Sequence, residues 1–125
     1  MIEIAKQVNQ EFSGEIPHHY DELIKIKGVG QYIANAILVF AFGQTYPLID
    51  EGIARVYRRV FGKERLKRAY ADKELWNFAT QMLPQDKVRE YNWGLLDISA
   101  VLCKPRKPNC SVCPLQKICL FIDEN

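Results

Sequence analysis

The segment that decides the fold lies near the C-terminus and runs CKPRKPNCSVCPLQKIC from Cys103 to Cys119. It contains all four cysteines of the chain, at Cys103, Cys110, Cys113 and Cys119, separated by six, two and five residues. Disulfides of a secreted protein would normally spread over the chain, and residues 1–10 lack the hydrophobic core of an export signal. Because cysteines that cluster in a reducing compartment indicate a metal centre, the segment is predicted to bind metal.

The length and composition of the chain are those of one globular domain. Its 125 residues are 48% hydrophobic and 26% charged. Glycine and proline total only 13 residues, and aromatic residues make up 11%, which excludes intrinsic disorder. No apolar run approaches the roughly 18 residues of a membrane span. We therefore expect no membrane contact and a cytoplasmic location, associated with the nucleoid if the source is bacterial or archaeal.

The net charge of +2 hides an uneven distribution. Residues 1–51 carry −4, whereas residues 52–125 carry +6. Seven lysines and arginines lie between Arg55 and Arg68, with Glu64 as the only acid among them. Such a run is either a solvated face or a surface for nucleic-acid phosphates, and charge alone leaves both interpretations open.

Apolar residues recur at helical spacing along most of the chain, and no alternating strand pattern is present, so the sequence predicts an all-α fold. Ser13-Gly14 and Gly28-Val29-Gly30 interrupt helices, while Asp50, Asp72 and Asp86 are placed to begin them. The helices are expected over residues 2–12, 20–26, 31–42, 52–61, 72–82 and 86–102.

The helix expected over residues 31–42 contains the run YIANAILVFAF, which is apolar on nearly every face. A helix that is hydrophobic all round must be buried all round, and the other expected helices are too few to enclose it. The sequence therefore predicts a further covering surface over residues 32–42, either a second chain or an N-terminal half absent from these 125 residues.

Two glycines lie two residues apart in the segment IKGVGQYIANA, residues 26–36. They leave backbone N–H groups uncovered, which suits either a tight corner between helices or a site for one phosphate. The segment resembles the helix–hairpin–helix of the endonuclease III and adenine-glycosylase superfamily. PLID at residues 47–50, followed by Arg55-Val56, resembles that family's segment with the catalytic aspartate, and YNWGLLD at residues 91–97 resembles its last long helix. The cysteine spacing matches the family's [4Fe–4S] signature.

The resemblance covers essentially the whole chain and implies the C-terminal portion of a helix–hairpin–helix DNA glycosylase. It implies two parts: residues 1–83 from an incomplete six-helix barrel, and residues 84–125 with the last helix and the cluster loop. The partner it implies is double-stranded DNA, bound through the hairpin and the loop cations. The residues expected to contact DNA phosphates are Lys27, Gly28, Val29, Gly30, Gln31, Lys104, Arg106 and Lys107.

The cofactor that the resemblance implies is one [4Fe–4S] cluster. Its ligands would be Cys103, Cys110, Cys113 and Cys119. Zinc is the alternative, because it also takes four thiolates. The gaps of six and five residues fit poorly with the paired C-x2-C knuckles of a zinc site.

Two residues are catalytic candidates. Asp50 matches the family's aspartate, whose carboxylate would stabilise oxocarbenium character on the sugar, although an acid in this place also simply caps a helix. Tyr32 stands where bifunctional members carry a Schiff-base lysine. Tyrosine has no amine to attack the sugar, so no lyase activity is expected, and tyrosine here resembles the monofunctional thymine/uracil mismatch glycosylases. Packing at a helix start is the other interpretation of Tyr32.

The chain departs from the usual hairpin at two places, with Lys27 instead of proline and Ile33 instead of threonine. The expected function is still removal of a flipped base, T or U opposite G or A opposite a damaged G, by a protein that needs an N-terminal half for its full pocket. Two alternatives stay open. One is a non-catalytic helix–hairpin–helix and iron–sulfur module that binds DNA, and the other is a structural iron–sulfur domain for a protein partner.

Overall fold

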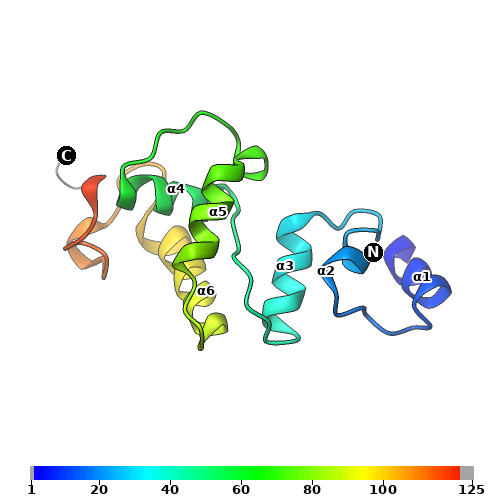
Figure 1. Cartoon of the computed structure of the whole chain (residues 1–125). Coiled ribbons are helices and arrows are strands. Elements are labelled where there is room, and N and C mark those ends of the chain that lie inside the picture. The colour runs from blue at the N-terminus through cyan, green and yellow to red at the C-terminus, as the bar shows by residue number, and fades with distance from the viewer. Residues whose placement is uncertain (1, 122–125) are drawn as a thin grey trace. The chain divides into compact units, whose positions relative to one another are not determined.

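The structure is a computed structural model that describes residues 2–121 of the chain. Within that range it contains helices and irregular segments and no strand, as Figure 1 shows. No helix in the range is long and apolar enough to cross a membrane. The chain forms two compact units, one ending at Tyr46 and the other beginning at Pro47. The sequence analysis divided the chain differently, between a barrel part that ends at residue 83 and a part with the last helix and the cluster loop that begins at residue 84. That division stays a prediction.

The first unit contains α1 (Ile2–Glu11), α2 (Tyr20–Leu23) and α3 (Gln31–Phe40). All three helices were predicted, and each ends before its expected last residue, by one residue in α1, three in α2 and two in α3. After α2 the chain makes tight turns, in which Ile26 N donates to the Leu23 carbonyl and Val29 N to that of Ile26. These i to i+3 bonds bring the chain to Gly28, whose φ of +90° favours glycine.

Apolar side chains from all three helices form the core of this unit. α3 buries Ala34 and Leu38 against Leu23 of α2 and against Ile26 and Val29 of the turn. Further side chains from all three helices and the segments that follow them pack around this centre: Ile4, Val8, Phe12, Tyr20, Ile37 and Tyr46. The hairpin that carries the two glycines is therefore anchored by burial on both of its sides.

The apolar helix α3 is only partly enclosed. Ile33 keeps 44% of its surface exposed, and Phe42, just beyond the helix, keeps 40%. These residues leave apolar surface of the kind that prompted the prediction of a covering partner. A second chain over residues 32–42 stays a prediction.

The second unit contains α4 (Glu51–Phe61), α5 (Lys73–Met82) and α6 (Val88–Asp97), with a 3-10 turn at Ala69–Ala71. The predicted N-caps of two helices are confirmed: Asp50 Oδ1 accepts from Ile53 N at 2.7 Å, and Asp72 Oδ1 accepts from Leu75 N at 3.1 Å. The expected start of α6 at Asp86 is wrong by two residues. Lys87, with φ 57°, is its N-cap and turns the chain into the helix.

The end of α6 differs from an ordinary helix. From Ile98 to Leu102 it continues as a π-helix, and Cys103 N donates to the Ile98 carbonyl at 2.7 Å. A π-turn adds a residue to the helical ring and shifts the direction of the side chains that follow. This turn delivers Cys103, the first residue of the cysteine loop.

Three helices share the core of the second unit. It comprises Ile53, Val56, Tyr57 and Val60 of α4, Leu75, Trp76 and Ala79 of α5, and Val88 and Leu95 of α6. Tyr57 and Tyr91 share a hydrogen bond of 2.9 Å between their hydroxyls. Burial, and then this bond, raises the pKa of Tyr57 well above its usual range, so the phenol stays neutral. Tyr57 and Phe61 of α4 also contact the ring of Phe78 in α5, so α4 packs against both of the other helices.

The burial of α3 generates a test of the first unit. Leu38→Ala removes a fully buried side chain and is expected to lower the free energy of unfolding by about 2–5 kcal/mol. Urea unfolding followed by circular dichroism measures the change. Ile33→Ala on the same helix is the matched control, with an expected loss of about 1 kcal/mol or less. Equal losses in the two variants would contradict the core described above.

Candidate functional site

The N-terminus of α4 holds the candidate catalytic carboxylate. Asp50 lies half-buried, and its Oδ1 is engaged by the Ile53 N–H at 2.7 Å. Its other oxygen, Oδ2, meets no donor among residues 2–121. One hydrogen bond therefore fixes the carboxylate while the second oxygen keeps its capacity to interact with a substrate or a water. The capping and the catalytic interpretations of Asp50 are compatible.

A close approach of α6 confines Asp50 on one side. A Cβ atom on Gly52 would lie 3.2 Å from Ser99 Oγ and 3.3 Å from Asp50 Oδ1. Ser99 is buried, and its hydroxyl donates to the Leu96 carbonyl at 2.8 Å. Only glycine fits this gap without displacing either neighbour. Gly52 thus lets the first turn of α4 pack directly against the π-turn of α6.

Two arginines of α4 hold the start of the cysteine loop. Arg55 donates from Nε to the Cys103 carbonyl at 2.7 Å and from its NH2 nitrogen to the Ser99 carbonyl at 2.8 Å. One turn later, Arg59 donates to the carbonyls of Lys104 at 2.7 Å and Pro105 at 3.0 Å. The end of a helix leaves carbonyls without helical partners. These guanidinium groups satisfy carbonyls at that end and tie the loop to the helix that begins at Asp50.

The four cysteines line one small, nearly apolar cavity of about 20 Å³. None forms a disulfide, and the walls are completed mainly by apolar side chains of α4, α6 and the loop: Val56, Val60, Ile98, Leu102, Leu115 and Phe121. Arg59 also lines it and lies 3.4 Å from the Cys103 sulfur. The pattern of ligands expected from the sequence is thus brought together in space.

The electrostatics of the cavity favour a cationic occupant. Partial burial raises the pKa of the Cys110 thiol, and negative charge on Cys119, Cys103 and Cys113 raises it further, whereas Arg59 lowers it. Thiolates that repel one another are stabilised by metal centres, so the residues present fit an iron–sulfur cluster. Among residues 2–121 no three His, Cys, Asp or Glu side chains meet around a single metal ion.

The loop cations extend into solvent. Lys104, Arg106 and Lys107 lie between the first two cysteines and are exposed, and Lys107 has a left-handed φ of 52°. The hydrogen bonds from Arg59 to the carbonyls of Lys104 and Pro105 fix the backbone from which these side chains extend. Their backbone is therefore held in place while their charged ends remain available.

The hairpin of the first unit offers fewer free amides than its sequence indicates. Lys27 N donates to Gln7 Oε1 at 2.9 Å, and Val29 N donates to the Ile26 carbonyl. The N–H groups of Gly28, Gly30 and Gln31 donate to no group among residues 2–121. The last two begin α3, where N–H groups and the helix dipole favour an anion. The open amides of the predicted phosphate site are thus those of its glycines and of Gln31.

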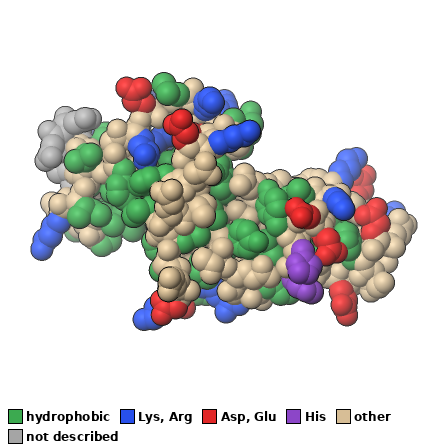
Figure 2. All heavy atoms as spheres, in the orientation of Figure 1, with side chains coloured by type: hydrophobic (Ala, Val, Ile, Leu, Met, Phe, Trp, Pro, Cys, Tyr) green, Lys and Arg blue, Asp and Glu red, His purple; other side chains and the backbone are tan. Residues whose placement is uncertain are grey.

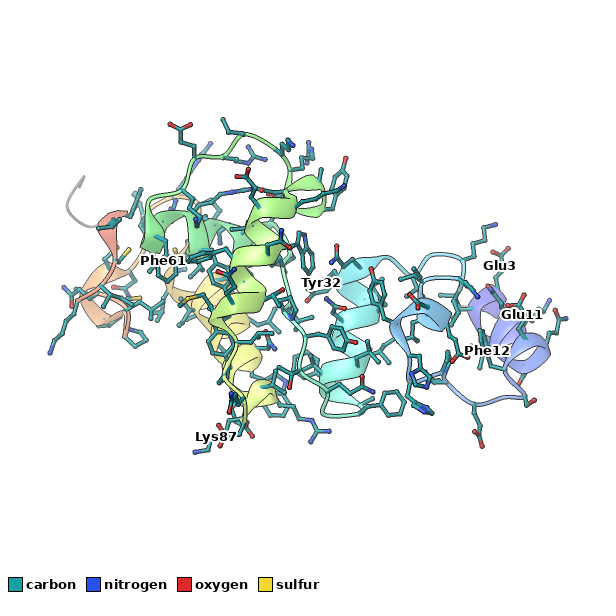
Figure 3. The ribbon with its side chains drawn as sticks, viewed as in Figure 1. Glu3, Glu11, Phe12, Tyr32, Phe61 and Lys87 are labelled. Carbon is teal, nitrogen blue, oxygen red and sulfur yellow. The ribbon has the colours of Figure 1, made fainter. Side chains whose placement is uncertain are left out.

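Tyr32 extends from the first turn of α3, as Figure 3 shows, and its side chain is half-buried. Like residues 27–31 of the hairpin, it belongs to the first unit. Asp50, the four cysteines and the loop cations belong to the second unit. The structure thus joins Asp50 to the cysteine loop through α4, and it describes Tyr32 and the hairpin as part of a separate body.

Sequence reasoning missed Gly52, Arg55, Arg59 and Ser99. Arg55 entered the sequence analysis in the segment that resembles the family's catalytic-aspartate segment, and both arginines belong to the cationic run between Arg55 and Arg68, but neither was assigned a structural role. Their spacing of four residues, on a helix whose N-cap is an aspartate, was a usable signal that they share one face. Nothing in the sequence names backbone carbonyls as their partners.

Comparison with known proteins gives matches over both units. Residues 11–40 match the model of the helix-hairpin-helix motif, and residues 103–119 match that of the iron–sulfur binding domain of endonuclease III. A thymine-DNA glycosylase of Aeropyrum pernix is 37% identical over the whole chain, which covers 57% of that relative. An adenine DNA glycosylase of Buchnera aphidicola is 32% identical over 93% of the chain and 33% of its own length.

Solved structures agree with these matches. A thermostable thymine-DNA glycosylase superposes with a TM-score of 0.90 at 34% identity, over 98% of this chain and 57% of that one. A non-covalent endonuclease III–DNA complex gives a TM-score of 0.79 at 26% identity, over 95% and 54%. The chain spans only a little over half of the thymine-DNA glycosylases that it matches.

The attachment of the cysteine loop to α4 generates a test at Arg59. Arg59→Lys is expected to speed loss of the iron–sulfur cluster several-fold, because an ammonium cannot serve both carbonyls with the geometry of a planar fork. The decay of the cluster's visible absorbance in air or with a chelator measures this rate. Arg68→Lys, the same exchange at an exposed arginine of the neighbouring loop, is expected to leave the rate unchanged. A cluster equally stable in both variants would contradict the role of Arg59.

Proposed function

The chain belongs to the endonuclease III and adenine-glycosylase superfamily, and from that membership we propose that it is part of a DNA base-excision-repair N-glycosylase. The observation that carries the proposal is that one helix, α4, connects the two parts of the site. Asp50 caps its N-terminus, and Arg55 and Arg59 further along the helix hold the start of the cysteine loop. The reaction is hydrolysis of the bond between a flipped base and its sugar. The predictions of an all-α helix–hairpin–helix fold and of family membership are confirmed.

Asp50 supplies the chemistry of this reaction. Cleavage of an N-glycosidic bond places positive charge on the sugar ring, as in glycoside hydrolysis. A carboxylate already fixed in position stabilises that charge without reorganising. The bond from Ile53 N supplies the fixing, and the unengaged Oδ2 supplies an acceptor for the sugar face or for an attacking water.

DNA is held at two kinds of site in this proposal. The open amides of Gly28, Gly30 and Gln31 receive the oxygens of one phosphate, and the side chain of Lys27, which is 84% exposed, adds positive charge. In the second unit, Lys104, Arg106 and Lys107 contact further phosphates from the cysteine loop. The similarity to an endonuclease III that was solved in a non-covalent complex with DNA supports DNA as the partner.

The cofactor proposed for the loop is one [4Fe–4S] cluster, held by Cys103, Cys110, Cys113 and Cys119. When bound, the cluster supplies rigidity and charge compensation to the loop. The protein's own contribution is the apolar cavity, the π-turn that delivers Cys103, and the two arginines that fix the adjacent carbonyls. The iron–sulfur domain match supports the assignment, while the number of irons belongs to the proposal.

The proposed substrates are thymine or uracil opposite guanine. The support is the similarity to thymine-DNA glycosylase, together with the tyrosine at the position of the lyase lysine. Adenine opposite a damaged guanine is the second candidate, since adenine DNA glycosylases also match the chain. Both substrates require a base pocket that the rest of the full-length protein completes.

Asp50 is tested by a substitution that keeps its cap. Asp50→Asn preserves the acceptor for Ile53 N and is expected to lower the rate of base release at least about a hundredfold. Single-turnover release of thymine and uracil from a G-mismatched duplex by the full-length protein measures the rate. Asp86→Asn makes the same change at an exposed aspartate outside the site and is expected to leave the rate unchanged. An undiminished rate in Asp50→Asn would refute the catalytic assignment.

The absence of lyase chemistry is tested separately. Because Tyr32 offers no amine, borohydride is expected to trap no covalent adduct between the protein and a duplex that contains an abasic site. Electrophoresis under denaturing conditions reveals any adduct. A reduced protein–DNA crosslink would show that another amine takes the place of the missing lysine and that the protein is bifunctional.

A further inference from the structure

We propose that a cleft lined by arginines, between α4 and the start of the cysteine loop, binds one phosphate group of a DNA strand. The cleft has a volume of about 390 Å³ and is lined by Glu51, Arg55, Arg58, Arg59, Arg65 and Pro105. We call these residues the arginine cleft. All of them belong to the second unit, and none is among the residues assigned above to DNA or to catalysis. That DNA is the source of the phosphate rests on the proposed function.

Three of the four guanidinium groups are held in place before any ligand arrives. Arg55 is fixed by the carbonyls of Cys103 and Ser99, and Arg59 by those of Lys104 and Pro105. Arg58 is only 7% exposed and donates to the Lys67 carbonyl at 2.9 Å and to Asp72 Oδ2 at 3.1 Å. Side chains that are already ordered lose little entropy when an anion binds. The arginine cleft therefore differs from a group of mobile surface lysines.

The balance of charge in the cleft favours an anion. Four guanidinium groups face the carboxylate of Glu51 in the cleft and that of Asp72 behind Arg58. Glu51 Oε2 lies 3.7 Å from Arg65 and 4.0 Å from Arg58, while its Oε1 accepts from Ala69 N. Arg65 is 62% exposed, so it is the member free to turn toward a ligand. Two positive charges remain uncompensated among these groups.

Phosphate is the anion that matches these donors. Guanidinium groups present pairs of N–H donors that suit the oxygens of a phosphate, and several around one hollow bind it more strongly than single contacts do. The neighbours of the cleft favour a DNA strand as its source. Glu51 directly follows Asp50, and Pro105 lies between Lys104 and Arg106, which are proposed to contact DNA. Figure 2 shows Lys and Arg side chains, with acidic ones among them, over the segment between α4 and α5 next to the cleft.

The experiment compares variants that change the charge of the cleft in opposite directions. Arg65→Gln removes the exposed guanidinium and leaves the buried contacts intact, whereas Glu51→Gln removes the competing charge and keeps an acceptor for Ala69 N. Arg68→Gln, at an exposed arginine outside the cleft, is the matched control. Binding of inorganic phosphate is measured by calorimetry, and binding of a mismatched duplex is measured as a function of salt, both with the cluster-loaded protein.

Arg65→Gln is expected to weaken phosphate binding about threefold and to lower the salt slope of duplex binding by about one, more than Arg68→Gln does. Glu51→Gln is expected to tighten the binding of phosphate and the binding of the duplex. Equal effects of Arg65→Gln and Arg68→Gln, or no phosphate binding by the wild-type protein, would overturn the proposal. Phosphate binding that follows the variants while duplex binding does not would show that the cleft takes a free anion and would overturn its assignment to DNA.

Base release by the same preparations separates this proposal from the proposed function. In one outcome, thymine or uracil is released normally, but the binding of phosphate and duplex does not change with the charge of the cleft. This outcome would support the proposed function and contradict the phosphate site. In the other outcome, binding changes with the charge of the cleft as expected, but no base is released. This outcome would support the phosphate site and contradict the glycosylase assignment. The two failures give different sets of measurements.

Discussion

The second unit depends on hydrogen bonds from two arginines of α4 to backbone carbonyls at the start of the cysteine loop. Arg55 and Arg59 lie one turn apart, and together they serve the carbonyls of Ser99, Cys103, Lys104 and Pro105. A helix end leaves carbonyls without partners, and a charged donor satisfies them more strongly than a neutral one. Because Asp50 is the N-cap of α4, the helix that holds the loop is also the helix whose first turn fixes this carboxylate.

Much of the fold could be predicted from the sequence because local signals and tertiary packing agree. Asp50 and Asp72 cap their helices through the side-chain bonds that their positions indicated. The differences occur where tertiary contacts override the local pattern. The apolar residues of 24–26 suited a longer helix, but Gly28 requires a turn, and Ile26 is buried through that turn instead. Similarly, α6 begins after Asp86 because Lys87 adopts a left-handed conformation there.

The part of the candidate site that could be predicted is the part whose chemistry follows directly from the type of residue. Four cysteines at a family-specific spacing indicated one metal centre, and the structure lines one cavity with them. The roles of the arginines could not be predicted in this way. Every residue has a backbone carbonyl, so the sequence does not show which carbonyls accept hydrogen bonds from Arg55 and Arg59. The run from Arg55 to Arg68 therefore contains two kinds of cation: Arg55, Arg58 and Arg59 hold the protein together, whereas the remaining four are exposed.

The hairpin illustrates the same constraint in the first unit. Its sequence offers five adjacent residues, but Gln7 of α1 engages the N–H of Lys27, and the turn after α2 engages that of Val29. What stays open is the pair of glycine amides with that of Gln31, at a helix start where the dipole adds attraction for an anion. Gln7 also binds the residue two positions earlier, because its Nε2 donates to the Lys25 carbonyl at 3.0 Å. The side chain of Gln7 therefore ties α1 to both ends of the segment from Lys25 to Lys27, which leads directly into the first glycine.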